Sequence, residues 1–544
     1  MKKVIAFLLT AVLLLSVAAC NSKSDGGSPS NSGSSSSDKS ANGDKVRTVR
    51  VLGSDMHQTW ETRDKQESFK ALNELLKKYN LQIECEVISN EQYMQVIQTR
   101  TAAAMDLPDI VRSEELGITS ILNLGKQGIF IDIRELLAEY SNGNVEKYVE
   151  KYSKPLWNVI TTPDGKVYWI PGQQLITYKN KEFYSNLTLL IRGDWLETLG
   201  LDKLTTLDEF RDTLKAFQEN DVNKNGGKDE KMIFYLSSFQ YIAPSFGLPA
   251  GLVMIDVYDH VAKSPWLMKE ELVEYITYIN TLIKEDLIDI DALDKSGEVI
   301  LQKEKNNQVS AVCDWALGTW HDANVKEYGG YYVPVVLGKK KGEIPRTLAE
   351  DSFVTLSKFS VTKDVKDKQA VATLFDMIFT EEYANLYFYG AENVTHTVNE
   401  DGTKVFHPNF KDQDFYKEKA TGAYLWQGLL PGLQLSTWES YILGLKEERP
   451  DLESFSENYC INQEYWLMGD AGLAVPTDEE NELLATIEND IRTYSDETLT
   501  KLCLGQYDIS QIDQYIETIK ELGLDKLVKI YQDRHNRYLS VSGK

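Results

Sequence analysis

Residues 46–53, VRTVRVLG, are the first of three short apolar segments that decide the fold class. The second is LQIECEVI at residues 81–88, and the third begins with LPDIV at residues 107–111. Each is typical of a strand, and the intervening segments 65–79 and 92–105 have the apolar spacing of helices. Strands that alternate with helices in this way form parallel sheets covered by helices. The sequence therefore predicts an α/β fold.

The same alternation continues along the chain and ends in a helical tail. A turn, TPDG, precedes a predicted strand at residues 166–170, and further strands are predicted at 187–191 and 353–360. Helices are predicted near 195–199 and at 207–219, 269–285 and 368–379. In the tail, residues at helical spacing give one apolar face, formed by Ile512, Tyr515, Ile516, Ile519 and Leu522, and Gly523 follows where a C-terminal cap belongs.

Length and charge exclude several classes of protein. The chain has 544 residues, more than one hydrophobic core usually holds, so at least two domains are expected. It carries 58 Lys and Arg against 83 Asp and Glu, a net charge of −25, which disfavours nucleic acid or an anionic lipid surface as a partner. Four cysteines, Cys85, Cys313, Cys460 and Cys503, are far apart without a CxxC spacing, so we expect mostly buried free thiols.

The amino-terminal segment predicts export. Lys2 and Lys3 precede an apolar run at residues 4–15, and small residues then lead into Cys20, which describes a secretory signal over residues 1–19. The small residues before Cys20 resemble the bacterial lipobox, which implies that this cysteine is lipidated; the alternative is an ordinary signal peptide with a chance cysteine. Residues 20–45 are rich in Ser, Gly, Asn, Asp and Lys, which is typical of a flexible tether. We therefore expect a lipid-anchored body on the outer face of a Gram-positive cell membrane.

Five segments together resemble a known family. They are EQYMQVIQTRTAAAMDLPDI at 91–110, GKVYWIP at 165–171, IRGDWLETLG at 191–200, the strand and helix within 352–382, and the segment 493–532. In order and spacing they are similar to the bacterial extracellular solute-binding proteins of sugar ABC importers, in the large lipoprotein branch related to the alginate-oligosaccharide binders. The resemblance covers most of the chain after the signal peptide.

The resemblance implies a fold, a function and partners. The fold would be the two-lobed α/β fold of type II periplasmic binding proteins, with the ligand in a cleft between the lobes. Lobe 1 would comprise residues 46–171 and 347–400, and lobe 2 residues 172–346 and 401–544. The protein would be a monomer and not an enzyme, and it would capture an oligosaccharide and deliver it to ABC permease subunits. Hinges would lie near residues 170–172, 345–348 and 398–402.

A calcium loop is predicted at DVNKNGGKDE, residues 221–230. Oxygen-bearing side chains stand at loop positions 1, 3, 5 and 9, and a glycine at position 6 allows the sharp turn. Position 12 is Met232, so the bidentate glutamate of an EF-hand is absent. The related family uses an acidic residue at position 10 instead. The resulting ligand set is Asp221, Asn223, Asn225, the Gly227 carbonyl, Asp229 and Glu230, with a structural Ca²⁺; the alternative is a turn without metal.

Tryptophans are candidates for sugar contacts, because aromatic rings stack on the apolar faces of sugars. Trp315 and Trp320 lie in CDWALGTW, and Trp426 and Trp438 bracket the segment LWQGLLPGLQLSTW. By resemblance, Trp60 follows a strand that often touches ligand, and Trp169 lies at the lobe crossing. Arg112, Ser113 and Glu114 follow a strand whose end faces the cleft in the family. Core packing, or for the last three ordinary surface, is the competing interpretation.

Two other functions remain open from the sequence. A peptide- or other small-solute-binding lipoprotein would have the same architecture. A surface polysaccharide-active enzyme is less favoured, because the chain has no HExxH, GxSxG, Walker A or GxGxxG motif. For the sugar itself, the negative charge disfavours a uronate polymer, although Arg112 could reverse this locally. We expect a neutral or lightly charged oligosaccharide.

Overall fold

The chain divides into two units, residues 1–45 and residues 46–544. In the computed structural model the described residues are 45–542 except 155, 183–186, 235, 237–238, 240, 257, 291–296, 316–318, 345, 348–357, 412–414, 416–417, 448 and 463–471. The predicted signal peptide, Cys20 and nearly all of the tether therefore lie outside the described residues. In the part that is described, no helix has the length and apolar character needed to cross a membrane.

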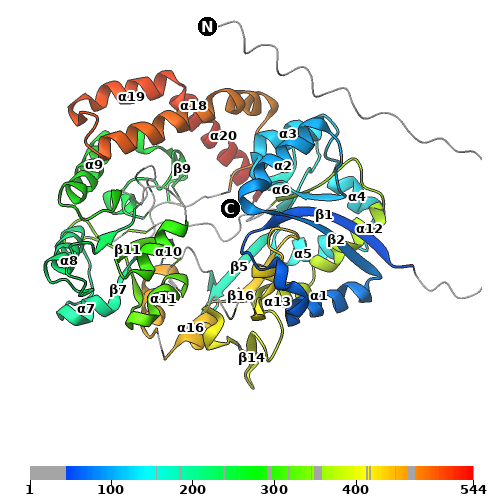
Figure 1. Cartoon of the computed structure of the whole chain (residues 1–544). Coiled ribbons are helices and arrows are strands. Elements are labelled where there is room, and N and C mark those ends of the chain that lie inside the picture. The colour runs from blue at the N-terminus through cyan, green and yellow to red at the C-terminus, as the bar shows by residue number, and fades with distance from the viewer. Residues whose placement is uncertain are drawn as a thin grey trace, which may run out of the picture. The chain divides into compact units, whose positions relative to one another are not determined.

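The amino-terminal segment forms the parallel sheet that the sequence predicts. β1 (Arg47–Asp55) pairs in parallel with β2 (Leu81–Ser89) and with β3 (Ile110–Arg112), and the five strands lie in the order β2-β1-β3-β13-β4. β13 (Lys358–Val361) is antiparallel to β3 and to β4 (Ile170–Pro171). The sheet and its helices share the first core (Figure 1). These helices are α1 (Glu67–Lys78), α2 (Asn90–Ala103), α3 (Gly117–Lys126), α4 (Ile133–Tyr140), α5 (Asn144–Tyr152), α6 (Leu156–Ile160), α12 (Lys368–Ile378), α13 (Glu381–Tyr389) and α15 (Gly422–Leu425).

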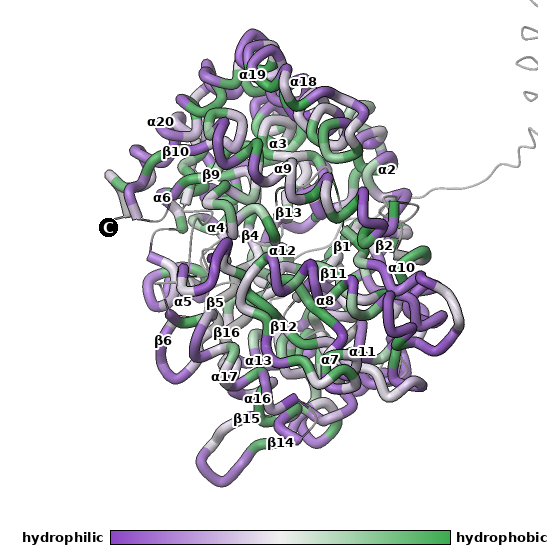
Figure 2. Tube along the Cα trace, turned by 90° about the vertical axis from the view of Figure 1, so that its left-hand side faces the viewer, coloured by the Kyte–Doolittle hydropathy of each residue, from purple (hydrophilic) through white to green (hydrophobic). Residues whose placement is uncertain are grey.

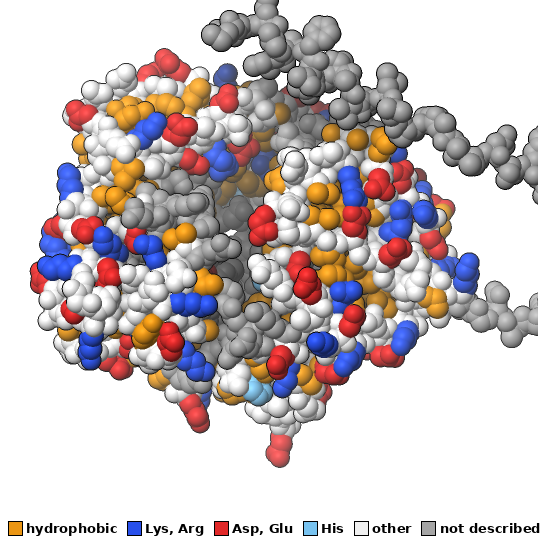
Figure 3. All heavy atoms as spheres, in the orientation of Figure 1, with side chains coloured by type: hydrophobic (Ala, Val, Ile, Leu, Met, Phe, Trp, Pro, Cys, Tyr) orange, Lys and Arg blue, Asp and Glu red, His pale blue; other side chains and the backbone are white. Residues whose placement is uncertain are grey.

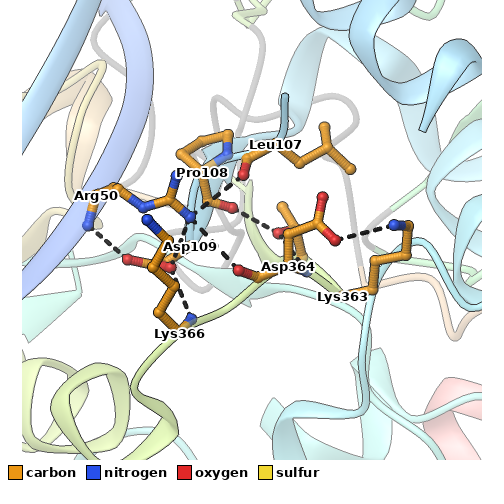
Figure 4. Close-up of polar contacts among 8 residues, drawn as sticks. Arg50, Leu107, Pro108, Asp109, Lys363, Asp364 and Lys366 are labelled. Atoms are coloured by element: carbon orange, nitrogen blue, oxygen red, sulfur yellow. Dashed lines mark hydrogen bonds and ion pairs between the residues drawn. The ribbon is translucent and has the colours of Figure 1, made fainter. Parts of the chain in front are cut away.

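The Leu-Pro-Asp-Ile motif stabilises this sheet through hydrogen bonds. Asp109 is buried and accepts hydrogen bonds from the backbone and side chain of Arg50 at 2.8 and 3.0 Å, and from the backbone of Lys366 at 3.0 Å. Arg50 also donates to the carbonyls of Leu107 and Asp364 (Figure 4). The motif thus ties β1, the start of β3 and the loop after β13 together, and its role is structural.

A second sheet has its own core. It lies in the order β12-β7-β11-β8, from β7 (Leu187–Arg192), β8 (Lys231–Met232), β11 (Val309–Trp315) and β12 (Tyr332–Val335). Arg192 is fully buried at the end of β7, where it pairs with Asp194 at 2.7 Å and stacks on Trp195 at 4.1 Å, so the IRGDWLETLG motif is also structural. The helices around this sheet are α7 (Gly193–Leu199), α8 (Leu207–Glu219), α9 (Lys269–Lys284), α10 (Gly297–Lys305) and α11 (Thr319–Val325).

Two parallel strands connect the regions of the two sheets. β5 (Gln173–Tyr178) follows β4 directly, pairs in parallel with β16 (Leu433–Thr437), and turns into β6 (Lys181–Glu182) before β7 begins. A smaller third core lies beside these strands and includes Tyr178, Val336, Tyr389 and Trp438. It also takes in α16 (Glu439–Leu445), α17 (Asp451–Phe455) and the hairpin of β14 (His396–Val398) and β15 (Lys404–Phe406).

The carboxyl-terminal helices return to the second core. α18 (Asp478–Cys503) packs on α9 and also touches α3, while α19 (Ile512–Glu521) and α20 (Leu524–Ser542) complete the core. The predicted apolar face of the tail is confirmed, since Ile512, Ile516 and Ile519 are buried. Gly523 has φ 115°, the conformation expected of a glycine cap. Figure 2 shows apolar residues gathered along the strands and polar residues at the tip of the β14–β15 hairpin.

Several local expectations differ from the structure. Residues 166–169 form no strand, because their apolar side chains insert into the first core, where Val167, Tyr168 and Trp169 are buried. Residues 398–402 are the turn of the β14–β15 hairpin, not a crossing between lobes; the chain crosses at β16 instead. Residues 420–433, which we expected in lobe 2, pack in the first core. Cys85, Cys313, Cys460 and Cys503 are free, and all but Cys85 are buried.

Candidate functional site

The carboxyl ends of β1, β3 and β4 lie at one edge of the first sheet. β1 and β3 run in parallel and end at Asp55 and Arg112. On β13, Phe359 lies opposite Arg112. Lys358, the residue before it, lies opposite Pro171 at the end of β4, so β4 ends at the same edge. The crossing strand β5 leaves from this edge. In α/β folds ligands bind at the carboxyl ends of strands.

The corresponding edge of the second sheet also adjoins the crossing strands. β7 begins at Leu187, shortly after β6, and this residue lies opposite Trp315 at the end of β11. β12 ends close by, with Val335 opposite Leu189. We call the residues at these two edges the sheet-edge site. Figure 1 shows β5 and β16 between the two sheets, and Figure 3 shows the surface hollowed in this part of the molecule.

Arg112 is the centre of the first edge. Its side chain is 7% exposed and donates to Ser54 Oγ at 2.8 Å, to Glu114 Oε2 at 3.1 Å and, as an ion pair, to Glu115 Oε1 at 2.7 Å. The backbone oxygen of Arg112 accepts the Tyr93 hydroxyl at 2.7 Å, which fixes the end of β3 against α2. The guanidinium is thus held in one orientation between two carboxylates.

Two polar atoms of this cluster have no partner among the described residues. These are the buried Nε of Arg112 and the buried Oε2 of Glu115. Burial raises the pKa of Glu115, and the charge of Arg112 opposes this rise. A buried donor and a buried acceptor without partners cost free energy, and a ligand that supplied both an acceptor and a donor at this strand end would offset that cost.

His57 and Gln427 extend the first edge. His57 Nε2 lies 2.9 Å from Gln427 Oε1, and its ring packs on Tyr424 at a centroid distance of 4.9 Å. Burial lowers the pKa of His57, and the hydrogen bond to Gln427 opposes this effect. Gln427 reaches this place because Gly53 and Gly428 touch: a Cβ on Gly53 would lie 1.9 Å from the Gly428 oxygen. The segment 424–428 is thereby fixed on the end of β1.

The second edge carries a chain of ionisable groups. His321 on α11 lies 2.8 Å from Asp314 Oδ2 at the end of β11 and 2.6 Å from Glu304 Oε1 on α10, and Asn324 donates to Glu304 Oε2 at 2.6 Å. Burial alone would lower the pKa of His321, but the Glu304 charge and the hydrogen bonds to both carboxylates raise it to about 10. His321 is therefore a cation at neutral pH. It is buried, whereas the Asp314 side chain is 36% exposed.

The predicted site residues occupy different environments. Arg112 and Glu114 lie in the site, whereas Ser113 is fully buried and bonds Ser360 at 2.8 Å. Trp60 packs against Phe69 and lies under the Arg63 guanidinium at 4.5 Å. Three other tryptophans are buried: Trp169 in the first core, Trp426 with its Nε1 on the Tyr383 hydroxyl, and Trp438 with its Nε1 on Ser456. The side chains of Trp315 and Trp320 lie outside the described residues. The sugar-stacking role of the six tryptophans stays a prediction.

Asp55, His57, Glu115, Asp314, His321 and Gln427 were not among the candidates that the sequence suggested. Asp55 and His57 follow the first predicted strand directly, and Asp314 precedes Trp315, so position at a strand end was a usable signal for these three. For Gln427 and His321 no such signal exists, since only tertiary packing brings them to the site.

The predicted calcium loop forms a compact turn after α8. Asp221 Oδ1 accepts the Asn225 and Gly226 amides at 3.1 Å, and Asp229 accepts the Asn223 and Asn225 side chains. Glu230 is fully buried and accepts only two long backbone hydrogen bonds, at 3.4 and 3.2 Å, with no cation beside it among the described residues. Its burial raises its pKa. The donors fit calcium, because all are oxygens and Glu230 needs a counter-charge. Still, the described residues hold no group of three or more His, Cys, Asp or Glu poised for a metal.

Comparisons with known proteins agree with this geometry. No family model matches the sequence. The chain is 25% identical over 217 residues to the fructooligosaccharide ABC transporter substrate-binding protein FusA of Streptococcus pneumoniae, covering 39% of this chain and 40% of that protein. It is 23% identical over 444 residues to the polygalacturonan/rhamnogalacturonan-binding protein YtcQ of Bacillus subtilis, covering 79% and 81%.

Solved structures match over nearly the whole body. FusA of S. pneumoniae in complex with kestose superposes with a TM-score of 0.72 at 18% identity, over 91% of this chain and 100% of that one. The alginate-binding protein AlgQ2 without calcium ion superposes with a TM-score of 0.67 at 19% identity, over 91% and 98%. A structure of an EF-hand mutant of FusA also matches, with a TM-score of 0.71, 18% identity and coverage of 91% and 100%.

The fold is that of the two-lobed solute-binding proteins, and the chain is related in sequence to those that serve carbohydrate ABC importers. The resemblance drawn from the sequence motifs is thereby confirmed, together with the fold class. The expectation of a binding protein rather than an enzyme is confirmed by the same relatives, which are named as binding proteins.

Proposed function

We propose that this protein captures an oligosaccharide in the sheet-edge site and delivers it to the permease of an ABC importer. The observation that carries the proposal is the pair of unpartnered buried atoms, Arg112 Nε and Glu115 Oε2, at the carboxyl end of β3. A sugar hydroxyl both accepts and donates a hydrogen bond, so sugars suit a strand end that offers a donor and an acceptor. Binding from both edges would draw the lobes together about β5 and β16.

Calcium and a lipid anchor belong to the same proposal. Asp221, Asn223, Asn225, Asp229, Glu230 and the Gly227 carbonyl would hold a Ca²⁺ that neutralises the buried Glu230 carboxylate and stiffens the loop. The structures of AlgQ2 without calcium ion and of an EF-hand mutant of FusA support this assignment. Cys20 would carry the lipid, and residues 20–45 would tether the body to the outer face of the membrane, as the lipobox-like sequence indicates.

Isothermal titration calorimetry of the full chain against a panel of oligosaccharides tests the proposal. We expect saturable binding of at least one sugar class, recovery of intact sugar, and a smaller radius of gyration in solution scattering when the sugar is bound. Arg112→Ala should abolish binding, and Gln427→Ala, which leaves the ion pairs of β3 in place, should weaken it. Arg492→Ala, on an exposed face of α18, is the control and should bind as the wild type does.

Three results would contradict the proposal. Cleaved sugar would identify an enzyme. Binding of peptides but of no sugar would favour the alternative of a peptide-binding lipoprotein of the same fold. Unchanged sugar affinity in both Arg112→Ala and Gln427→Ala, with folding verified by circular dichroism, would place the ligand elsewhere.

A further inference from the structure

We propose that the sheet-edge site selects neutral oligosaccharides and rejects sugars that carry uronic-acid carboxylates. This inference rests on the proposed function and names the chemical class of the ligand. It matters because the related proteins bind both kinds: FusA is named for fructooligosaccharides and YtcQ for polygalacturonan and rhamnogalacturonan.

At the first edge, the arginine that would attract a carboxylate is already neutralised. The terminal nitrogens of Arg112 are engaged with Ser54, Glu114 and Glu115. These contacts use three of its five N–H groups and set the guanidinium charge against two carboxylates of the protein itself. A ligand carboxylate that approached Arg112 would therefore also approach Glu114 and Glu115, and would compete with them for the same cation.

The remaining charges of the first edge do not reverse this balance. Lys358 adds one cation, at the start of β13, and it acts on Glu115. Asp55 adds one carboxylate, which accepts the backbone amides of Thr59 and Trp60 at 3.1 and 3.2 Å. Because burial lowers the pKa of His57, this ring is neutral at pH 7. Among these described residues, three carboxylates face two cations.

The second edge is also negative. His321 is a cation, but it lies between Glu304 and Asp314, so this group of three carries one net negative charge. The buried His321, itself held by Glu304, orients the partly exposed Asp314 carboxylate. Such a carboxylate accepts hydrogen bonds from sugar hydroxyls and repels a second carboxylate, more strongly inside a cleft than in water. Figure 3 shows acidic side chains on the rim of the hollow.

Matched ligands isolate the effect of charge. We would titrate the full chain with a panel of neutral trisaccharides that includes kestose and galactotriose, and with trigalacturonate, in which carboxylates replace the hydroxymethyl groups of galactotriose. The neutral member that binds should do so at least tenfold more tightly than trigalacturonate at low salt. The difference should shrink at high salt, because screening weakens the repulsion.

Two variants connect the selectivity to the residues. Glu114→Gln and Asp314→Asn each remove one negative charge at the site, and each should reduce the discrimination against trigalacturonate several-fold. Glu479→Gln removes the same charge from an exposed position at the start of α18 and should leave the discrimination unchanged. Equal effects of Glu479→Gln and Glu114→Gln would overturn the inference, because net charge would then suffice.

The outcomes separate this inference from the proposed function. Tighter binding of trigalacturonate than of every neutral sugar would overturn the inference and leave the oligosaccharide-binding function standing. Absence of binding by any sugar, neutral or charged, would overturn the proposed function itself. Neutral-sugar binding with the expected loss of discrimination in both site variants supports the two together.

Discussion

His321 lies buried between Glu304 and Asp314. Because of this position, we expect the folded state to lose stability as the pH rises into the alkaline range. The charge of Glu304 and the hydrogen bonds to both carboxylates raise the pKa of His321 from its ordinary value of 6.5 to about 10. The stabilisation is therefore complete below pH 6.5 and is lost as the pH rises through 10, in the order of a few kcal/mol. We expect the urea midpoint of the wild type to fall over this range. In His321→Gln it should be lower at pH 6.5 and much flatter with pH.

The exposed His407 supplies the control for this experiment. His407→Gln should keep the pH dependence of the wild type, since His407 is exposed and forms no ion pair with any of the described residues. Lysines and tyrosines titrate in the same range, so the informative quantity is the difference in the free energy of unfolding between variant and wild type. A difference independent of pH between 6.5 and 10 would show that His321 is neutral in the folded protein.

At single residues, the sequence correctly placed Arg112 and Glu114 at the end of a strand, because the apolar run before them is recognisable. Their contact with a ligand stays a prediction. The tryptophans show the limit: Trp426 and Trp438 lie in a polar, loop-like segment, yet their rings are buried and their indole nitrogens bond Tyr383 and Ser456. A sequence does not distinguish a ring that stacks on a ligand from one that packs inside, because both need an apolar surface with a polar end.

Among the elements, the contact between β1 and the segment 424–428 depends on two glycines. A Cβ on Gly53 would lie 1.9 Å from the Gly428 oxygen, so Gly53→Ala should push the backbone of β1 away from that of the segment 424–428. We expect a loss of about 1–3 kcal/mol in the free energy of unfolding, measured by urea denaturation. Sugar binding should weaken as well, since the shift moves Gln427 and Tyr424 away from His57.

Gly251→Ala is the matched control for this substitution. The nearest atoms to its added Cβ belong to the flexible end of Met254, at 3.3 and 3.5 Å, so the side chain can give way. Stability and affinity should stay near the wild type. An equal loss in both variants would attribute the effect to alanine in general and not to the close approach of the two segments.

The turn after α8 allows a test by removal of calcium. With excess EDTA the melting temperature should fall by a few degrees, and added Ca²⁺ should restore it, because an ion that binds only the folded state stabilises it. Glu230→Gln should be insensitive to both treatments, since it removes the buried charge that needs the ion. Asp259→Asn, in an exposed loop of the same core, should respond as the wild type does. A melting temperature unaffected by EDTA would favour the metal-free turn.

The helices were predicted best where the apolar spacing typical of a helix continues over many residues. The bounds of α8 and α9 match the expected segments almost residue for residue, and Thr206 caps α8 with the capping box that its sequence encodes. Residues 166–169 were misassigned because a short apolar run fits a strand and a buried extended loop equally well. The hairpin at 396–406 was missed for a similar reason: its two strands have only three residues each.

At the scale of the molecule, the separation of the two large cores predicts unfolding that is not two-state. Each sheet is enclosed in its own core, and β5 and β16 join the two regions. Without ligand, we expect the calorimetric enthalpy to exceed the van't Hoff enthalpy in scanning calorimetry. A bound sugar that contacts both edges should narrow the transition and bring the ratio closer to one. A ratio of calorimetric to van't Hoff enthalpy equal to one in the absence of ligand would contradict independent unfolding of the two cores.

The lobes themselves were predictable only in outline. Strand and helix alternation gave the α/β class and the length indicated at least two domains, but the return of residues 420–433 to the first core was not foreseen. That return depends on the contact between Gly53 and Gly428, which are 375 positions apart in the chain. Local sequence patterns carry no information on a contact between residues so far apart in the chain. Where a chain crosses between lobes several times, such contacts decide which segments belong to which lobe.

The four free cysteines make the body convenient for spectroscopy of lobe motion. Burial raises the pKa of Cys85 to about 12 and places the pKa of the other three still higher, so all four thiols are protonated at neutral pH. Protonated thiols react slowly with maleimides. A new cysteine on an exposed loop of each lobe would therefore take up a donor and an acceptor dye without removal of the native thiols. Energy transfer between the dyes would then follow opening and closing in single molecules.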